Sequence, residues 1–214
     1  MKIRYIYHSC YEIVTDTYQL VFDYYKGDLD LRDDLKKVFF VSHSHGDHYH
    51  PSVHDMADTV ILWEDIPYRD ENTIALGVGD DVSLDDLYVR TSGSTDEGLS
   101  FEIELDGKRL IHAGDLNDWN WPDDTPEEEE EMHEAFLKHL AVFKKNPDAL
   151  FFPIDYRIEH NYDKGINEAI KQLTPTYVFP LHFTAHPEIL PVYKEKVRGK
   201  TIIVLPEETP FELT

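Results

Sequence analysis

Short runs of β-branched and aromatic residues, each ended by a charge or a turn signal, place the strongest limit on the fold of this chain. In the first half these runs follow one another with no helical pattern between them, and Asp106-Gly107, a strong hairpin signal, joins the last two. The predicted strands of this half are Lys2–Tyr7, Tyr11–Val14, Gln19–Asp23, Val38–Ser42, Thr59–Leu62, Tyr88–Thr91, Leu99–Leu105 and Lys108–His112. The first half is therefore predicted to form sheet.

The second half alternates helices with strands, which is typical of βα units packed on a sheet. Its longest helix has a clear start, because Thr125 is a favourable N-cap, Pro126 suits the first helical position and Glu128 completes a capping box. In chain order, beginning with a helix and alternating with strands, the predicted elements are Pro126–Lys145, Leu150–Asp155, Lys164–Leu173, Tyr177–Leu181, Glu188–Val197 and Thr201–Leu205. The two halves together predict an α/β protein.

The composition bounds the size and the partners of the protein. The chain has 214 residues, of which 41% are hydrophobic, and this fits one globular domain or at most two small ones; we expect a single domain spanning residues 1–214. The chain has 43 acidic and 20 basic residues, so its net charge is −23. We therefore expect neither nucleic acid nor a membrane as a partner. The single cysteine, Cys10, and the absence of a visible signal peptide lead us to expect a cytoplasmic protein; the oligomeric state is left open.

A histidine-rich motif directly follows one predicted strand. After the apolar run Val38–Val41, the side chains of His43, His45, Asp47 and His48 fall within six residues. Three imidazoles and a carboxylate in a loop can turn toward one metal ion, and the fixed pattern His-x-His-x-Asp-His rarely arises by chance. We expect these four residues to be metal ligands.

Two later segments also place a polar side chain at the end of a strand. Asp115 follows a small glycine-containing turn, and His182 follows the apolar run 177–181. Taken alone, Asp115 would be a turn residue and His182 a hydrogen-bonded core histidine. The histidine-rich motif upstream makes metal ligation the better interpretation of both.

With these motifs the sequence resembles the metallo-β-lactamase superfamily of metal-dependent hydrolases over nearly its whole length. The opening Tyr7-His8-Ser9-Cys10-Tyr11 and the later Leu20-Val21-Phe22-Asp23 are similar to the branch that includes ascorbate-phosphate lactonase-like proteins. The resemblance implies a four-layer αββα sandwich with a site for one or two divalent ions per chain. Zinc is the expected metal, with manganese or iron as alternatives.

The resemblance also implies a role for each ligand. One ion would bind His43 and His45 plus one further residue; the other would bind Asp47, His48 and His182, and Asp115 would touch both. Asp47 and Asp115 are the expected catalytic carboxylates. A hydroxide formed from the shared water would attack a small ester, lactone or phosphoester.

One part of the sequence departs from the family pattern. Members usually carry another histidine ligand, often in Gly-His-Thr, where this chain has Ser94. Serine is a poor ligand for a zinc-like ion, so Asp96 or Glu97 could substitute and favour harder ions such as manganese or iron. The segment could equally be only a turn, and both interpretations stay open.

Other residues have weaker support. His8 could orient a metal ligand or pack in the core, and Arg157 is the basic residue we expect near a substrate anion. The alternative function is a metal-stabilised binding or sensor module with lost or weak catalysis. A nuclease of the same superfamily is disfavoured by the net charge of −23.

Overall fold

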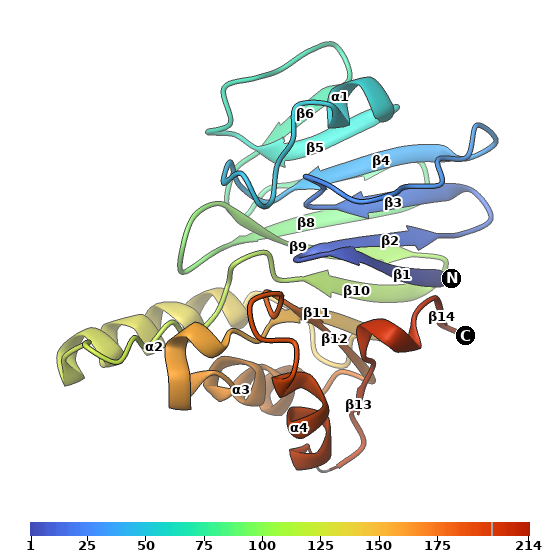
Figure 1. Ribbon diagram of the computed structural model, residues 1–214. Helices are drawn as coiled ribbons and strands as arrows, with labels where there is room; N and C mark the ends of the chain where they lie inside the picture. Colours follow the sequence, from blue (N-terminus) through green and yellow to red (C-terminus); the bar gives the residue numbers. More distant parts are fainter. Residues whose placement is uncertain (198) are drawn as a thin grey trace. The chain divides into compact units, whose positions relative to one another are not determined.

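The computed structural model describes residues 1–197 and 199–214, which divide into two compact units. One unit consists of residues 1–77 and 206–214, and the other of residues 78–205. In the described chain, each unit contains one seven-stranded mixed sheet (Figure 1). The α/β class predicted from the sequence is confirmed.

The sheet of the first unit has the strand order β14-β1-β2-β3-β4-β5-β6. Its elements are β1 (Lys2–Tyr7), β2 (Cys10–Val14), β3 (Tyr18–Phe22), β4 (Lys36–Val41), α1 (Val53–Met56), β5 (Thr59–Trp63), β6 (Thr73–Leu76), the 3-10 helix η2 (Pro206–Glu208) and β14 (Phe211–Glu212). Strand β3 is buried at all five positions, as expected for a central strand covered on both faces.

The strand directions in this unit bring three loops to one edge of the sheet. β1 and β3 are both antiparallel to β2, so they run in the same direction, and β3 is parallel to β4. The carboxyl ends of β1, β3 and β4 therefore meet at one edge. His8, Asp23 and the loop from Ser42 to His48 directly follow these three ends.

The sheet of the second unit has the order β13-β12-β11-β10-β9-β8-β7. Its elements are β7 (Asp81–Leu84), β8 (Leu87–Gly93), β9 (Leu99–Leu105), β10 (Lys108–His112), α2 (Pro126–Leu140), β11 (Ala149–Pro153), the 3-10 helix η1 (Tyr156–Asn161), α3 (Lys164–Leu173), β12 (Tyr177–Leu181), α4 (Ile189–Lys196) and β13 (Ile202–Ile203). Strand β11 is buried throughout, and its Phe151 pairs in register with Phe179 of β12.

Four strands of the second unit also end at a common edge. β10, β11 and β12 are mutually parallel, and β8 has the same direction as β10 because both are antiparallel to β9. Their carboxyl ends are followed by the loop from Ser94 to Gly98 and by Asp115, Asp155 and His182. Residues that are up to 88 positions apart in the sequence therefore reach one sheet edge.

Most elements lie where the sequence predicts them, and the differences have local causes. The predicted helix Pro126–Lys145 ends at Leu140, because the chain turns so that the Lys144 amide can donate to Glu102 Oε2 at 2.8 Å. The predicted strand Leu150–Asp155 leaves the ladder at Pro153, and the Asp155 side chain accepts from the Arg157 amide at the start of η1. The short elements α1, β6 and β7 have no counterpart in the sequence prediction.

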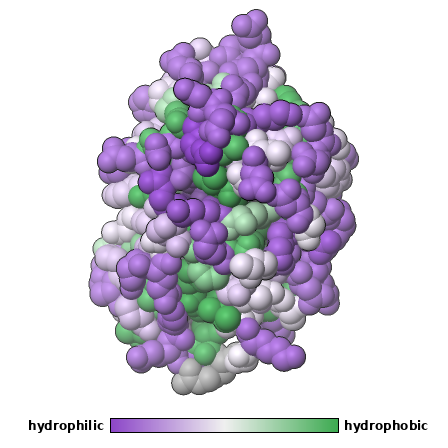
Figure 2. Space-filling model, turned by 90° about the vertical axis from the view of Figure 1, so that its right-hand side faces the viewer, coloured by the Kyte–Doolittle hydropathy of each residue, from purple (hydrophilic) through white to green (hydrophobic). Residues whose placement is uncertain are grey.

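Hydrophilic side chains cover most of the molecular face seen in Figure 2, in keeping with the large excess of acidic residues. Among the described residues, no helix combines the length and the apolar character that crossing a membrane requires.

Candidate metal centre

The loop after β4 presents the predicted N-terminal ligand group, His43, His45, Asp47 and His48. His43 and His48 are fully buried, whereas His45 is exposed. The rings of His43 and His45 lie 4.6 Å apart, and a nitrogen atom of each lies within 4.8 Å of the other. These two imidazoles can bind one ion together.

A buried carboxylate fixes the orientation of this loop. Asp23 accepts hydrogen bonds from the Ser42 amide and hydroxyl, both at 2.8 Å, and from His48 Nδ1 at 3.0 Å. Since the Ser42 hydroxyl gives its hydrogen to Asp23, His43 Nδ1 must donate to Ser42 Oγ across their 2.9 Å contact. Both histidines therefore carry a proton on Nδ1, which makes Nε2 the nitrogen that would ligate a metal ion.

His8 belongs to the same edge. It is buried, its Nε2 lies 3.5 Å from Asp47 Oδ2, and its ring centre is 5.4 Å from that of His48. A ligating nitrogen of His8 and one of His48 lie within 4.8 Å of each other. Of the two roles left open by the sequence, contact with predicted ligands is the one that the structure supports.

In the second unit, Asp115 and His182 form the predicted C-terminal ligand group. Asp115 Oδ1 lies 3.1 Å from His182 Nε2, and both side chains are buried. On the opposite side of the ring, His182 Nδ1 lies 3.0 Å from Asp155 Oδ2. The imidazole is therefore held between two carboxylates.

These carboxylates control the charge of the imidazole. Burial alone would lower the pKa of His182, but attraction to Asp115 and Asp155 outweighs burial and raises the pKa to about 10. For Asp155, burial opposes ionisation, yet hydrogen bonds from His182 and Arg157 hold its pKa well below the usual range. Without a metal ion, the His182 imidazole is a cation at neutral pH.

Asp155 is not among the site residues predicted from the sequence, and the predicted position of Arg157 near a substrate anion stays a prediction. Arg157 donates from Nε to Asp155 Oδ2 at 2.7 Å and from its backbone amide to Asp155 Oδ1 at 2.9 Å. Its guanidinium thus stabilises a buried carboxylate in the structure. The only sequence signal for Asp155 is its position directly after an apolar strand.

Two tryptophans extend from this group. Trp119 Nε1 donates to the Asp115 carbonyl at 2.8 Å, and its ring centre lies 5.7 Å from that of His182. Trp121 stacks on Trp119 at 6.2 Å, and the Arg157 guanidinium carbon lies 5.9 Å from the Trp121 ring centre. The aromatic loop after Asp115 therefore packs against the ligand group.

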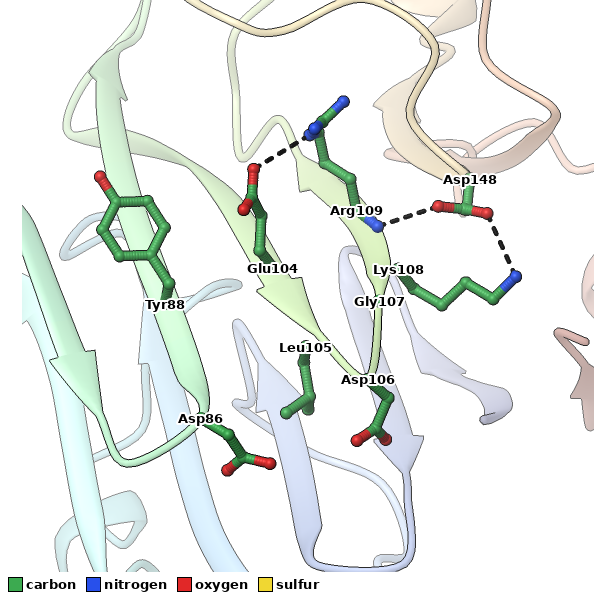
Figure 3. A pocket seen from close by; sticks show the side chains of 9 residues that line it. All are labelled: Asp86, Tyr88, Glu104, Leu105, Asp106, Gly107, Lys108, Arg109 and Asp148. Atoms are coloured by element: carbon green, nitrogen blue, oxygen red, sulfur yellow. Dashed lines mark hydrogen bonds and ion pairs between the residues drawn. The ribbon is translucent and has the colours of Figure 1, made fainter.

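A polar pocket of about 450 Å³ lies at the β9–β10 hairpin, where β10 starts and thus away from Asp115 (Figure 3). Both of its cations are paired with carboxylates: Arg109 Nε lies 3.3 Å from Glu104 Oε1, and Lys108 Nζ lies 3.3 Å from Asp148 Oδ1. We assign this pocket no part in the metal centre.

The donor set suits a divalent transition metal. Imidazole nitrogens with a fixed Nδ1 proton and buried carboxylates are the ligands that zinc, iron and manganese accept. The buried carboxylates behind His48 and His182 are the outer hydrogen-bond partners that such ligands require. Two mixed sheets with these ligand groups at their edges define an α/β protein of the metal-binding type.

The chain belongs to the β-lactamase superfamily, since residues 2–182 match the family model of the beta-lactamase superfamily domain. Its two mixed sheets and their helices confirm the predicted metallo-β-lactamase fold class. No curated protein matches the chain.

Several solved structures share the fold at low identity. Igni18, a metallo hydrolase from the archaeon Ignicoccus hospitalis, is 21% identical with a TM-score of 0.66, over 96% of this chain and 95% of that one. A metal-dependent hydrolase from Parabacteroides distasonis is 17% identical with a TM-score of 0.65, over 95% and 91%. CmlA, a diiron β-hydroxylase from Streptomyces venezuelae, is 11% identical with a TM-score of 0.61, over 95% of this chain and 52% of that one.

Proposed function

We propose that residues 1–214 act as one metal-dependent hydrolase domain on a small ester, lactone or phosphoester. The observation that carries the proposal is that His48 and His182 each have Nδ1 held by a buried carboxylate, which makes Nε2 the nitrogen that would ligate a metal ion, in His182 after loss of the Nε2 proton. A carboxylate behind Nδ1 is the usual outer hydrogen-bond partner of a metal-ligating histidine, and here each of the two sheets supplies one such pair.

The proposed ligands are His43, His45, Asp47, His48, Asp115 and His182, shared between two ions. When bound, divalent ions lower the pKa of a coordinated water and polarise the electrophile, which is the chemistry that hydrolysis needs. Zinc is the first candidate, and the diiron enzyme among the fold relatives is a reason to test iron and manganese beside it.

The protein's own residues supply orientation and charge. Asp23 holds His48 and, through Ser42, His43, so that the loop enters the site with its nitrogen atoms already directed. Asp155 does the same for His182, and hydrogen bonds from His182 and Arg157 lower the pKa of Asp155 against the effect of its burial. This preorganisation reduces the conformational entropy lost when an ion binds.

The remaining parts of the proposal concern branch, substrate and location. The segment from Tyr7 to Tyr11 supports the ascorbate-phosphate lactonase-like branch, and the net charge of −23 favours a small molecule over nucleic acid as the substrate. The single cysteine cannot form a disulfide within the chain, which supports a cytoplasmic location.

The test replaces two proposed ligands singly with alanine, Asp47→Ala and Asp115→Ala, and measures hydrolysis of ester, lactone and phosphodiester panels with zinc, manganese and iron. We expect kcat/KM to fall by at least about 100-fold, because losing even an outer partner of a ligand costs 10- to 100-fold. Asp65→Ala, which removes an exposed carboxylate after β5, is the matched control. Unchanged hydrolysis in both ligand variants would refute the mechanism, and metal binding without any hydrolysis would favour the binding-module alternative.

A further inference from the structure

The loop from Ser94 to Gly98 follows β8 and shares its sheet edge with Asp115. β8 and β10 run in the same direction, since both are antiparallel to β9, so the segments after these two strands are neighbours at the edge. A carboxylate oxygen of Asp96 lies within 4.8 Å of one of Asp115. The tertiary structure thus brings a second carboxylate to a predicted metal ligand.

Hydrogen bonds hold the two carboxylates at this spacing. The Thr95 hydroxyl donates to the Asn117 carbonyl and accepts from the Asn117 amide at 3.0 Å. Asn117 is buried and lies two residues beyond Asp115, while Thr95 directly precedes Asp96. One hydroxyl group therefore fixes both segments to each other.

Asp96 differs in its contacts from Ser94 and Glu97, the other two candidate ligands of this loop. The Ser94 hydroxyl accepts from the Asp96 amide at 3.2 Å, so it serves the backbone of the turn. Glu97 is exposed and is not among the described residues whose donor atoms cluster for a metal ion. Of the two carboxylates in this described loop, Asp96 is the one whose oxygen clusters with a donor atom of Asp115.

We infer that Asp96 is a ligand of the metal ion that Asp115 binds, and that its carboxylate biases this position toward manganese or iron over zinc. The inference rests on the proposed function. An ion with oxygen ligands at about 2.0–2.6 Å spans two oxygens up to about 5 Å apart, which includes this pair. A divalent cation also binds two neighbouring carboxylates favourably, and oxygen ligands favour harder ions.

The test compares metal binding by the full chain and its variants, using isothermal titration calorimetry with manganese alone and with zinc alone. We expect Asp96→Ala and the isosteric Asp96→Asn to weaken manganese binding by at least about tenfold, since even outer-shell losses cost that much. Asp96→His should lower manganese affinity and retain or raise zinc affinity, because imidazole suits zinc. Glu97→Ala, which removes the adjacent exposed carboxylate, is the matched control and should bind both metals as the unmodified chain does.

Circular dichroism of each metal-free variant verifies that it is folded. Because Asp96 is exposed, we expect its substitution to leave the fold intact. If the unmodified chain binds metal and both Asp96→Ala and Asp96→Asn bind it with the same affinity, the role of Asp96 would be overturned. The proposed hydrolase would be left intact. An unmodified chain that binds neither metal would overturn both. A zinc preference that Asp96→His leaves unchanged would count against the assigned selectivity.

Discussion

Two histidines on different sheets are supported in the same way. His48 is bonded through Nδ1 to Asp23, and His182 is bonded through Nδ1 to Asp155, and each carboxylate is almost inaccessible to solvent. Burying a carboxylate is costly unless it is paired and hydrogen-bonded, and here each one receives at least three donors. The positions of the ligand side chains are thus determined by residues that are not themselves proposed ligands.

The charge of His182 predicts how the stability of the metal-free protein depends on pH. The pKa of His182 is about 6.5 when unfolded and is raised to about 10 when folded, so the folded state binds more protons between these values. The stabilisation is complete below about pH 6.5 and is lost as the pH rises toward about 10, with a slope of at most about 1.4 kcal/mol per pH unit for one proton.

Urea unfolding of the metal-free chain across this pH range measures that slope. His182→Gln should flatten it, because the titrating imidazole is gone, whereas His50→Gln, at an exposed histidine of the first unit, should not. Equal slopes in the unmodified chain and in His182→Gln would show that the imidazole is not held as a cation. Metal binding at neutral pH should release a proton, since the ligating imidazole must be neutral.

At the scale of elements, strand direction determines which loops meet and helix packing keeps them in place. Helix α3 (Lys164–Leu173) approaches the loop after Asp115 at Gly165, where an added Cβ would overlap Asn117 Oδ1 and lie 2.9 Å from the Asp118 amide nitrogen. A glycine lets this helix lie directly against the backbone that follows a proposed ligand.

Gly165→Ala is therefore expected to destabilise the protein, although alanine is the better helix former by about 0.5–1 kcal/mol. The overlap forces the loop or the helix to move, and such overpacking typically costs about 1–3 kcal/mol. Chemical denaturation measures the change. Gly46→Ala is the control, because nothing lies within 4 Å of its added Cβ, and its stability should stay close to that of the unmodified chain. Equal stability of the two variants would contradict close packing at Gly165.

For the whole molecule, the proposed metal ions link binding to folding. The net charge of −23 opposes compaction through self-repulsion, and bound divalent cations would reduce it. A ligand present at 100 times its dissociation constant stabilises the folded state by about 2.7 kcal/mol.

Removing the metal with a chelator should accordingly lower Tm, and adding back manganese or zinc after the chelator is removed should restore it. Differential scanning calorimetry with parallel elemental analysis measures both quantities on the same sample. Magnesium, which dehydrates reluctantly and is a poor partner for imidazole, is the control and should restore much less. A Tm that stays constant while the metal content falls to zero would contradict a structural contribution from the ions.

The sequence by itself determined features that depend on neighbouring residues. Strand β9, strand β10 and helix α3 have the predicted bounds, because the Asp106-Gly107 turn and the hydrophobic periodicity act locally. The histidine motif was visible for the same reason, since His43, His45 and His48 lie close together in the chain.

Only the tertiary structure decided the parts that come from distant segments. Asp155 supports His182, and Asp96 lies beside Asp115, because non-local strand pairing brings the ends of β8, β10, β11 and β12 to one edge. Likewise the early end of α2 depends on Glu102, which lies 42 positions before the Lys144 amide that it accepts from. A local pattern cannot specify these contacts, because their energy depends on which strands pair and on which charges become buried together.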